Sequence, residues 1–391
     1  MKYLGLELPF LVKNGAVHTA REITQQPEIW QKIWIDVHLQ RKVLGDFLER
    51  ALAEAKQIIL TGAGTSAFIG HSLSGAFQRN KNIVTNAIST TDLVSHPRDY
   101  LHPELPTFMI SFARSGNSPE SVAAVAFTDE LCAKSFHLII TCNDEGALSR
   151  YVSGRNGDHN FVFVLPKEAN DQGLAMTSSY TGMLLAGILI SELDKLDLNR
   201  PVVNTIANYG LKVIDYYADD LRHIAEKDFR RAVFLGSGPF HGTARESHLK
   251  LQELTDGRII CKEDSFLGFR HGPKVVIDES TLVVYLFSNN DYVAKYERDL
   301  VTSMKKGQPP LLEVGIMESV TQTLDLDFMF PFSENGTRIK EEYLTVCSAI
   351  PAQVLAFFKS LHLGLSPDTP SKTGAIARVV EGVQIYDFKG C

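Results

Sequence analysis

The spacing of the hydrophobic positions changes near residue 57. Before that point, Ile29, Trp30, Ile33 and Trp34 recur at helical spacing, and a second helical pattern runs over residues 36–55. Beyond it, short apolar runs alternate with helical stretches, and these runs begin at residues 57, 107, 136, 161, 232 and 281. Strands that alternate with helices are typical of parallel sheets covered on both faces. The pattern therefore predicts an N-terminal helical segment over 1–45, followed by an α/β fold.

Two glycine turns indicate that the α/β part is repeated. The turns GAG at 62–64 and GSG at 236–238 lie 174 positions apart, and so do Thr107 and Thr281, which open the next strongly apolar runs. One common offset predicts two copies of one domain. The long helical stretch near 207–225 is the expected boundary, and no low-complexity linker follows it. The predicted domains, which we expect to pack tightly, cover 46–215 and 216–391.

Composition and charge narrow the possible partners. The chain is 44% hydrophobic and carries a net charge of −7, which argues against a nucleic-acid partner. Its five cysteines form no C-x-x-C pair, so we expect a reducing compartment and neither a disulfide framework nor a zinc site. The N-terminus is too polar for a signal peptide, and the apolar stretch 183–190 is far shorter than the roughly 18 residues of a membrane span. A cytoplasmic protein that binds no membrane and no metal is expected.

The first glycine turn has three interpretations. Residues 62–67 fit the relaxed dinucleotide-binding pattern G-x-G-x-x-A, and Gly64 would let the backbone approach a phosphate. A ribose-binding acid should follow about 20 residues later, at the end of the next strand. None is found there, and Asp92 comes late. A tight turn without ligand remains open, as does a phosphate or sugar-hydroxyl site that uses the hydroxyls of Thr65 and Ser66.

A serine-rich loop follows the apolar run at 107–113. Ser118, Pro119 and Glu120 have the order of an N-cap, a first-turn proline and an acidic first turn. Arg114 and Ser115 would then lie beside a helix N-terminus at the end of a strand, where open α/β sheets bind ligands. Hydroxyls, backbone amides and a guanidinium suit a phosphate dianion. Ordinary capping beside a solvated arginine is the alternative.

The second half contains a candidate acid–base pair. Glu246, Lys250 and Glu253 share one face of a predicted helix, so Lys250 could keep Glu253 ionised and ready to accept a proton. A surface ion-pair stripe would give the same spacing. His271 lies between chain-bending residues in R-H-G-P and could present an imidazole for proton transfer. A histidine on the surface, or one satisfied within the core, is the alternative.

Taken together, these motifs resemble the sugar isomerase (SIS) family. GAGTS, FARSGNS, FLGSG, LKLQE and RHGP stand in the order seen in the isomerase half of glucosamine-6-phosphate synthase. The segments TAREITQQPEIW and SPDTPSKTGAIARVVEGVQIYDF are more particularly similar to the AgaS-type proteins of this family. The resemblance implies two tandem flavodoxin-like SIS domains in a homodimer or dimer of dimers with shared active sites, and no cofactor.

The resemblance also implies roles for residues of the first domain. Phosphate-binding hydroxyls correspond to Thr65, Ser66, Ser115 and Ser118. Arg114 stands where the family has a glutamine, so a guanidinium is gained there. Thr177 and Ser178 fall on the family's sugar-binding turn, of which only Thr177 is retained.

Catalytic roles fall mainly in the second domain. Glu253 corresponds to the proton-transfer glutamate, Lys250 to a lysine that contacts the sugar chain, and His271 to a ring-opening histidine that the neighbouring subunit supplies. Arg378 aligns with the lysine that forms a Schiff base in the synthase, while Lys372 lies out of register. An arginine does not form that imine at neutral pH.

The implied reaction is deamination of galactosamine 6-phosphate to a tagatose phosphate and ammonia. The substrate's own amine would provide the imine that the missing lysine cannot form. Aldose–ketose isomerisation of tagatose 6-phosphate, without ammonia, needs the same base. A phosphosugar-sensing protein without catalysis is an alternative of another class.

Overall fold

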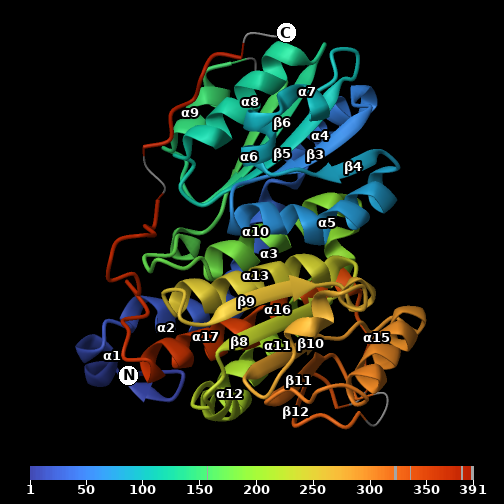
Figure 1. Ribbon diagram of the computed structural model, residues 1–391. Coiled ribbons are helices and arrows are strands. Elements are labelled where there is room, and N and C mark those ends of the chain that lie inside the picture. Colours follow the sequence, from blue (N-terminus) through green and yellow to red (C-terminus); the bar gives the residue numbers. More distant parts are fainter. Residues whose placement is uncertain (156, 321–323, 335, 380–381, 389–391) are drawn as a thin grey trace.

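Two parallel sheets with a layer of helices between them form the protein (Figure 1). The structure is a computed structural model, and it describes residues 1–391 except 156, 321–323, 335, 380–381 and 389–391. In the first sheet the strand order is β4-β3-β5-β6-β7, and in the second it is β12-β11-β10-β8-β9, all parallel. Each sheet thus has the flavodoxin-like order 2-1-3-4-5. The predicted α/β fold with two parallel sheets is confirmed.

Six of the ten strands of the two sheets, β3, β5, β6, β7, β8 and β10, lie where the apolar runs predicted them. Those of the first sheet are β3 (Gln57–Thr61), β4 (Val84–Ala87), β5 (Thr107–Ala113), β6 (Ser135–Thr141) and β7 (Asn160–Val164). Those of the second are β8 (Arg231–Gly236), β9 (Ile260–Asp264), β10 (Thr281–Leu286), β11 (Leu312–Met317) and β12 (Phe328–Pro331). Their long apolar runs are explained by burial on both faces: Ile58 and Leu60 point into the shared core, and Ile59 points into the outer one.

Both glycine turns have the same backbone conformation. Gly64 has φ 54° and ψ −127°, and Gly238 has φ 56° and ψ −126°. A positive φ of this kind favours glycine. Each of these glycines is the N-cap of a central helix, α5 (Thr65–Lys81) after β3 and α13 (Pro239–Leu254) after β8. The turns therefore direct two equivalent helices into the layer between the sheets.

The layer between the sheets is one continuous core. Helices α5 and α13 pack against each other there, together with α3 (Gln26–Leu39), α10 (Ser178–Ser191), α11 (Leu196–Lys212), α16 (Glu341–Cys347) and α17 (Ile350–His362). All 14 residues of α10 are buried, which explains why its sequence is apolar on every side. A single cluster of buried side chains extends from Leu4 to Phe358. The two halves therefore share a core, as the absence of a linker predicted.

Further helices cover the outer face of each sheet. On the first sheet these are α6 (Thr90–Ser95), α7 (Pro97–Tyr100), α8 (Pro119–Leu131) and α9 (Ala147–Ser153). On the second they are α14 (Phe266–Phe269) and α15 (Asp291–Met304). In the described part of the chain, the stretch Glu341–His362 is long and apolar enough to cross a membrane, but 94% of its most apolar window is buried inside the protein. Its burial identifies it as core.

The N-terminal segment is more divided than its helical pattern predicted. A short hairpin of β1 (Lys2–Tyr3) and β2 (Leu6–Glu7) precedes α1 (Leu8–Lys13), α2 (Val17–Thr24), α3 and α4 (Arg41–Glu54). One helix ends at Thr24 and the next begins at Gln26, with Pro27 in its first turn. The predicted boundary at 45/46 falls inside α4. The boundary at 215/216 falls inside a π-helical turn, Val213–Tyr217, that joins α11 to α12 (Ala218–Ala225).

The C-terminal tail leaves the second sheet and ends on the first. After α17 it runs along the side of the molecule to the outer face of the first sheet (Figure 1). Ile385 and Phe388 pack against the outer core there, and the ring of Phe388 lies 6.1 Å from that of Phe127. The sequence assigned this tail to the second domain. Its partly buried Ile385 and Phe388 instead pack against the first.

Candidate active site

A cavity of about 500 Å³ lies where the start of α5 meets the end of α13. Gly64 and Thr65 line it from α5, Leu249, Lys250 and Glu253 from α13. The remaining lining residues come from the glycine turn, the end of β5, the loop before α10 and the C-terminal tail: Ala63, Arg114, Leu174, Met176 and residues 374–379. Residues from both halves of the chain thus build one site.

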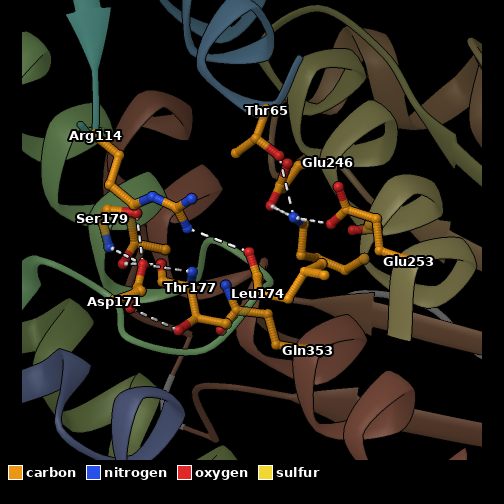
Figure 2. A network of polar contacts seen from close by, with 12 residues as sticks. Thr65, Arg114, Asp171, Leu174, Thr177, Ser179, Glu246, Glu253 and Gln353 are labelled. Carbon is orange, nitrogen blue, oxygen red and sulfur yellow. Dashed lines mark hydrogen bonds and ion pairs between the residues drawn. The ribbon is translucent and has the colours of Figure 1, made fainter. Parts of the chain in front are cut away.

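Lys250 is the centre of a polar cluster in this cavity. Its partners Thr65, Glu246 and Glu253 are labelled in Figure 2. The Lys250 side chain is 1% exposed, and its Nζ donates to Glu253 Oε2 at 2.6 Å and to Thr65 Oγ1 at 3.1 Å. Burial opposes the charge of Lys250, but the carboxylates of Glu246 and Glu253 outweigh it and raise its pKa. The Glu253 side chain is 23% exposed. The helical spacing therefore marks a buried cluster that presents one carboxylate to the cavity.

Glu246 is the third member of the cluster. It is fully buried, 3.4 Å from Lys250 Nζ, and burial together with the charge of Glu253 raises its pKa to about 8. Burial thus favours the protonated form of Glu246. Glu253 lines the cavity and Glu246 does not, so Glu253 is the carboxyl group of the cluster that a ligand could reach.

A smaller cavity of about 130 Å³ adjoins the first. Ser66, Ser115, Gly116 and Ser118 line it, at the N-terminus of α8. Both cavities share Ala63, Arg114, Met176, Arg378 and Val379. Backbone amides at a helix N-terminus and serine hydroxyls form a setting suited to an anion. Three of the predicted phosphate-binding residues, Ser66, Ser115 and Ser118, are thus brought together beside the cavity of Glu253, while Thr65 lines that cavity itself.

Arg114 and Arg378 stand at the junction of the two cavities. Arg114 is 7% exposed, and its Nη1 donates to the Leu174 carbonyl at 3.3 Å while Nη2 donates to the Arg378 carbonyl. The Nε of Arg378 donates to the Asp171 carbonyl at 2.8 Å. Lys372 lines neither cavity. Of the two basic residues considered in the tail, Arg378 reaches the site.

Thr177 and Ser178 lie outside both cavities. Both are fully buried, and the carboxylate of Asp171 accepts hydrogen bonds from the Thr177 amide and hydroxyl and from the Ser178 amide at 2.9–3.0 Å (Figure 2). The Ser178 hydroxyl donates to the Glu22 carbonyl. Their polar groups are therefore occupied in starting α10.

His271 is exposed and lies far from Glu253 of the same chain. It follows α14, beyond the carboxyl end of β9, on the side of the second sheet where α13 begins. Glu253 stands at the other end of α13, whose 16 residues span about 24 Å. Within one chain, the structure does not bring the predicted acid–base pair together.

The comparisons with known proteins agree with this architecture. A family model described as SIS domain matches residues 51–190. The protein named D-galactosamine-6-phosphate deaminase AgaS from Shewanella sp. (strain ANA-3) is 37% identical, over 97% of this chain and 94% of that protein. This chain belongs to the AgaS family.

Two solved structures extend the likeness of this AgaS-family chain to the whole fold. One from Clostridium novyi NT has a TM-score of 0.95 and 39% identity, and it covers 99% of this chain and 100% of that one. Another, described as tagatose-6-phosphate ketose/aldose isomerase from Escherichia coli, has a TM-score of 0.86 and 34% identity, over 95% and 97% of the two chains. The residues matched by the SIS model include all five strands of the first sheet, β3 to β7, and nearly all of α10.

Three site features of this AgaS-family chain were missed by sequence reasoning. Glu246 was noted only for its spacing, yet it is the fully buried acid of the cluster. Asp171 sits in a polar loop, and only the hydroxyl-rich T-S-S that follows it signals a helix start. Glu22 lies in α2, far from the motifs in sequence, and no local signal points to it. Among the described residues, no group of three or more His, Cys, Asp or Glu is placed to hold a metal ion.

Proposed function

We propose that this chain deaminates galactosamine 6-phosphate, with isomerisation, to tagatose 6-phosphate and ammonia. The observation that carries the proposal is the position of Glu253. Its carboxylate is held by the buried Lys250 and opens to a cavity that joins the serine-lined phosphate chamber through Arg114. A phosphosugar anchored at one end would therefore lie with its carbon chain along the carboxylate.

The phosphate would bind in the smaller cavity. Ser66, Ser115 and Ser118 supply hydroxyls, the start of α8 supplies amides, and Arg114 supplies positive charge. With the phosphate fixed, C1 and C2 of the sugar would both lie within reach of the Glu253 carboxylate. That matters because a single carboxylate must reach both carbons.

Glu253 would then move one proton from C2 to C1 of the open-chain sugar. Removing the C2 proton gives a 1,2-enolamine, and returning it to C1 leaves an imine at C2. Water adds to this carbon and the C–N bond breaks, so the products are ammonia and the 2-ketose phosphate. The ammonium of Lys250, 2.6 Å from Glu253 Oε2, would hold the carboxylate in position for both proton transfers.

Ring opening requires a second acid–base group. His271 of the same chain is too far away, so we assign this step to His271 of the partner subunit in a homodimer, as the family resemblance implies. The exposure of the His271 loop supports this assignment. The unpaired Cys132, Cys142, Cys261 and Cys347 support a cytoplasmic location.

The deciding experiment measures ammonia release from galactosamine 6-phosphate. Glu253→Gln should lower kcat by about a thousandfold, because it removes the base, while phosphosugar binding persists. Gln252→Glu, one position along the same helix, is a matched control for charge. Near-normal turnover by Glu253→Gln would exclude Glu253 as the base.

The same assay separates the alternatives. No ammonia, but conversion of tagatose 6-phosphate to an aldose, would show the plain isomerase. Tight binding of phosphosugars without turnover of either would show a sensor.

A further inference from the structure

One loop, residues 170–174, holds both arginines at the junction of the cavities. The Leu174 carbonyl accepts from Arg114 Nη1, and the Asp171 carbonyl accepts from Arg378 Nε and Nη2. Asn170 Oδ1 takes a further bond from Arg378 at 2.9 Å. These hydrogen-bond partners are carbonyl and amide oxygens, so they hold the two guanidiniums in place without pairing them with a carboxylate. The position of the loop consequently sets where their positive charge lies.

Helix α2 holds this loop from the side away from the cavities. Glu22 Oε1 accepts from the Gln172 amide at 2.5 Å, and the Gly173 amide lies 3.3 Å from Oε2. Glu22 is 1% exposed and lines neither cavity. A Cβ on Gly173 would lie 2.9 Å from Thr19 Oγ1 and 3.1 Å from Glu22 Oε2. The loop thus fits closely against α2.

The same helix also fixes the start of the C-terminal tail. Asp368 Oδ1 accepts from the Thr19 amide and hydroxyl, both at 2.8 Å, and Oδ2 accepts from the His18 amide at 3.1 Å. The Leu174 amide donates to the Asp368 carbonyl at 3.0 Å. Loop and tail, which carry or hold the two arginines, are therefore joined at α2.

Glu22 is maintained there against an electrostatic cost. Burial and the nearby carboxylate of Asp171 raise the pKa of Glu22 to about 8. Asp171 itself is fully buried and accepts five hydrogen bonds from Thr177, Ser178 and Ser179. Two buried carboxyl groups so close together oppose folding unless each satisfies other polar groups. Here Glu22 accepts hydrogen bonds from backbone amides within the loop. Asp171 accepts hydrogen bonds from backbone amides of the helix start that follows the loop.

We propose that Glu22 is a positioning residue for substrate binding: it fixes the 170–174 loop, and through it Arg114 and Arg378, at the junction of the two cavities. The inference rests on the proposed function for the nature of the ligand, a phosphosugar. Glu22 acts through the arginines, so its loss should weaken binding and leave the chemistry at Glu253 largely intact.

Two variants test the proposal by different routes. Glu22→Gln places an amide group opposite a backbone amide, and Gly173→Ala pushes the loop from α2 without changing any charge. Each should raise the Kd of galactosamine 6-phosphate and of inorganic phosphate by about tenfold, as expected for groups that orient a ligand-binding side chain. At saturating substrate, kcat should stay within about twofold of the wild type. Calorimetric titration and the ammonia assay give these values.

Glu192→Gln is the matched control. Glu192 is also a buried acid, 5% exposed, at the far end of α10, where it contacts Asn199, Lys340 and Tyr343. It should lower the melting temperature without raising either Kd. An equal rise in Kd for Glu192→Gln, or an unchanged Kd in Glu22→Gln and Gly173→Ala, would overturn the proposal. If Glu22→Gln does not fold, Gly173→Ala decides. If the wild-type protein releases no ammonia, the proposed function is wrong. The Kd for inorganic phosphate then still tests whether Glu22 positions the two arginines.

Discussion

The loops that follow β5 and β10 occupy equivalent places in the two sheets but have opposite contents. After β5, Arg114 and Ser115 face open cavities. After β10, the Ser288 amide donates to Glu297 Oε2 at 2.9 Å and its hydroxyl donates to Glu341. Asn289 donates to Glu318 at 2.6 Å. In the first loop Ser118 also donates to a carboxylate, Glu120, but Arg114 bonds only to carbonyl oxygens and lines both cavities. In the second loop Ser288 and Asn289 both donate to carboxyl groups of their own domain.

This difference shows that the shared topology does not decide which half binds an anion. Strand order, glycine turn and helix start are the same in both halves. The cavity beside Ser288 measures only about 40 Å³, against about 130 Å³ beside Ser115. Function therefore depends on side chains placed on the fold. The second half contributes Lys250 and Glu253 from its central helix instead.

Alanine substitutions at the corresponding positions of the two loops should give the largest difference in substrate binding. Arg114→Ala should weaken galactosamine 6-phosphate binding by about a hundredfold, since it removes a buried charge from the junction of the cavities. Ser288→Ala, at the corresponding position, should change that Kd by less than about twofold. Titration calorimetry measures both. Equal effects would mean that the second loop also takes part in binding.

Glu297, the buried acid of α15 that accepts from the Ser288 amide, should make the stability of the protein depend on pH. Burial raises the pKa of Glu297 to about 8. Between about pH 4.5 and 8 the unfolded chain ionises this group while the folded chain keeps it protonated, so its contribution to stability falls as pH rises. Glu297→Gln cannot ionise, and it should gain roughly 3.5 kcal/mol over wild type between pH 5 and pH 8.

Urea unfolding at the two pH values checks this prediction. Glu279→Gln, an exposed acid on the same domain, should show no such pH-dependent gain. If Glu297→Gln tracks the wild type at both pH values, Glu297 is ionised in the fold and balances charge differently.

Alanine substitutions in the two glycine turns should have similar effects on stability but different effects on phosphosugar binding. Gly64→Ala and Gly238→Ala each force a side chain into positive φ with no atom nearby to clash, at about 1–2 kcal/mol in the free energy of unfolding. Only Gly64→Ala should also weaken phosphosugar binding, because Gly64 lines the cavity. Chemical denaturation and titration test the pair, and weaker binding by Gly238→Ala would contradict the division between the halves.

The sequence predicted the strands and glycine turns of the repeat better than the contacts between segments that are distant in the chain. Buried parallel strands are continuous apolar runs, so Thr107–Ala113 could be located to the residue. Gly64, Thr65, Arg114, Lys250 and Glu253, which line the cavity, were singled out because turns and helix spacing are local, and their roles were implied by the family resemblance. The division of the N-terminal helices, the partners of Thr177 and Ser178, and the role of Glu22 depend on contacts between distant segments, which leave no periodic signal.

The order of synthesis gives the C-terminal tail a further importance. Both sheets are complete by Pro331, and domains fold as the chain emerges. The wall of the cavity at 374–379 and the apolar anchor at Phe388 are made last. A nascent or prematurely terminated chain would hold every strand and the Glu253 cluster, yet its reaction chamber would stand open to water. The segment that walls the cavity is thus synthesised after every strand and after the helix that carries Glu253.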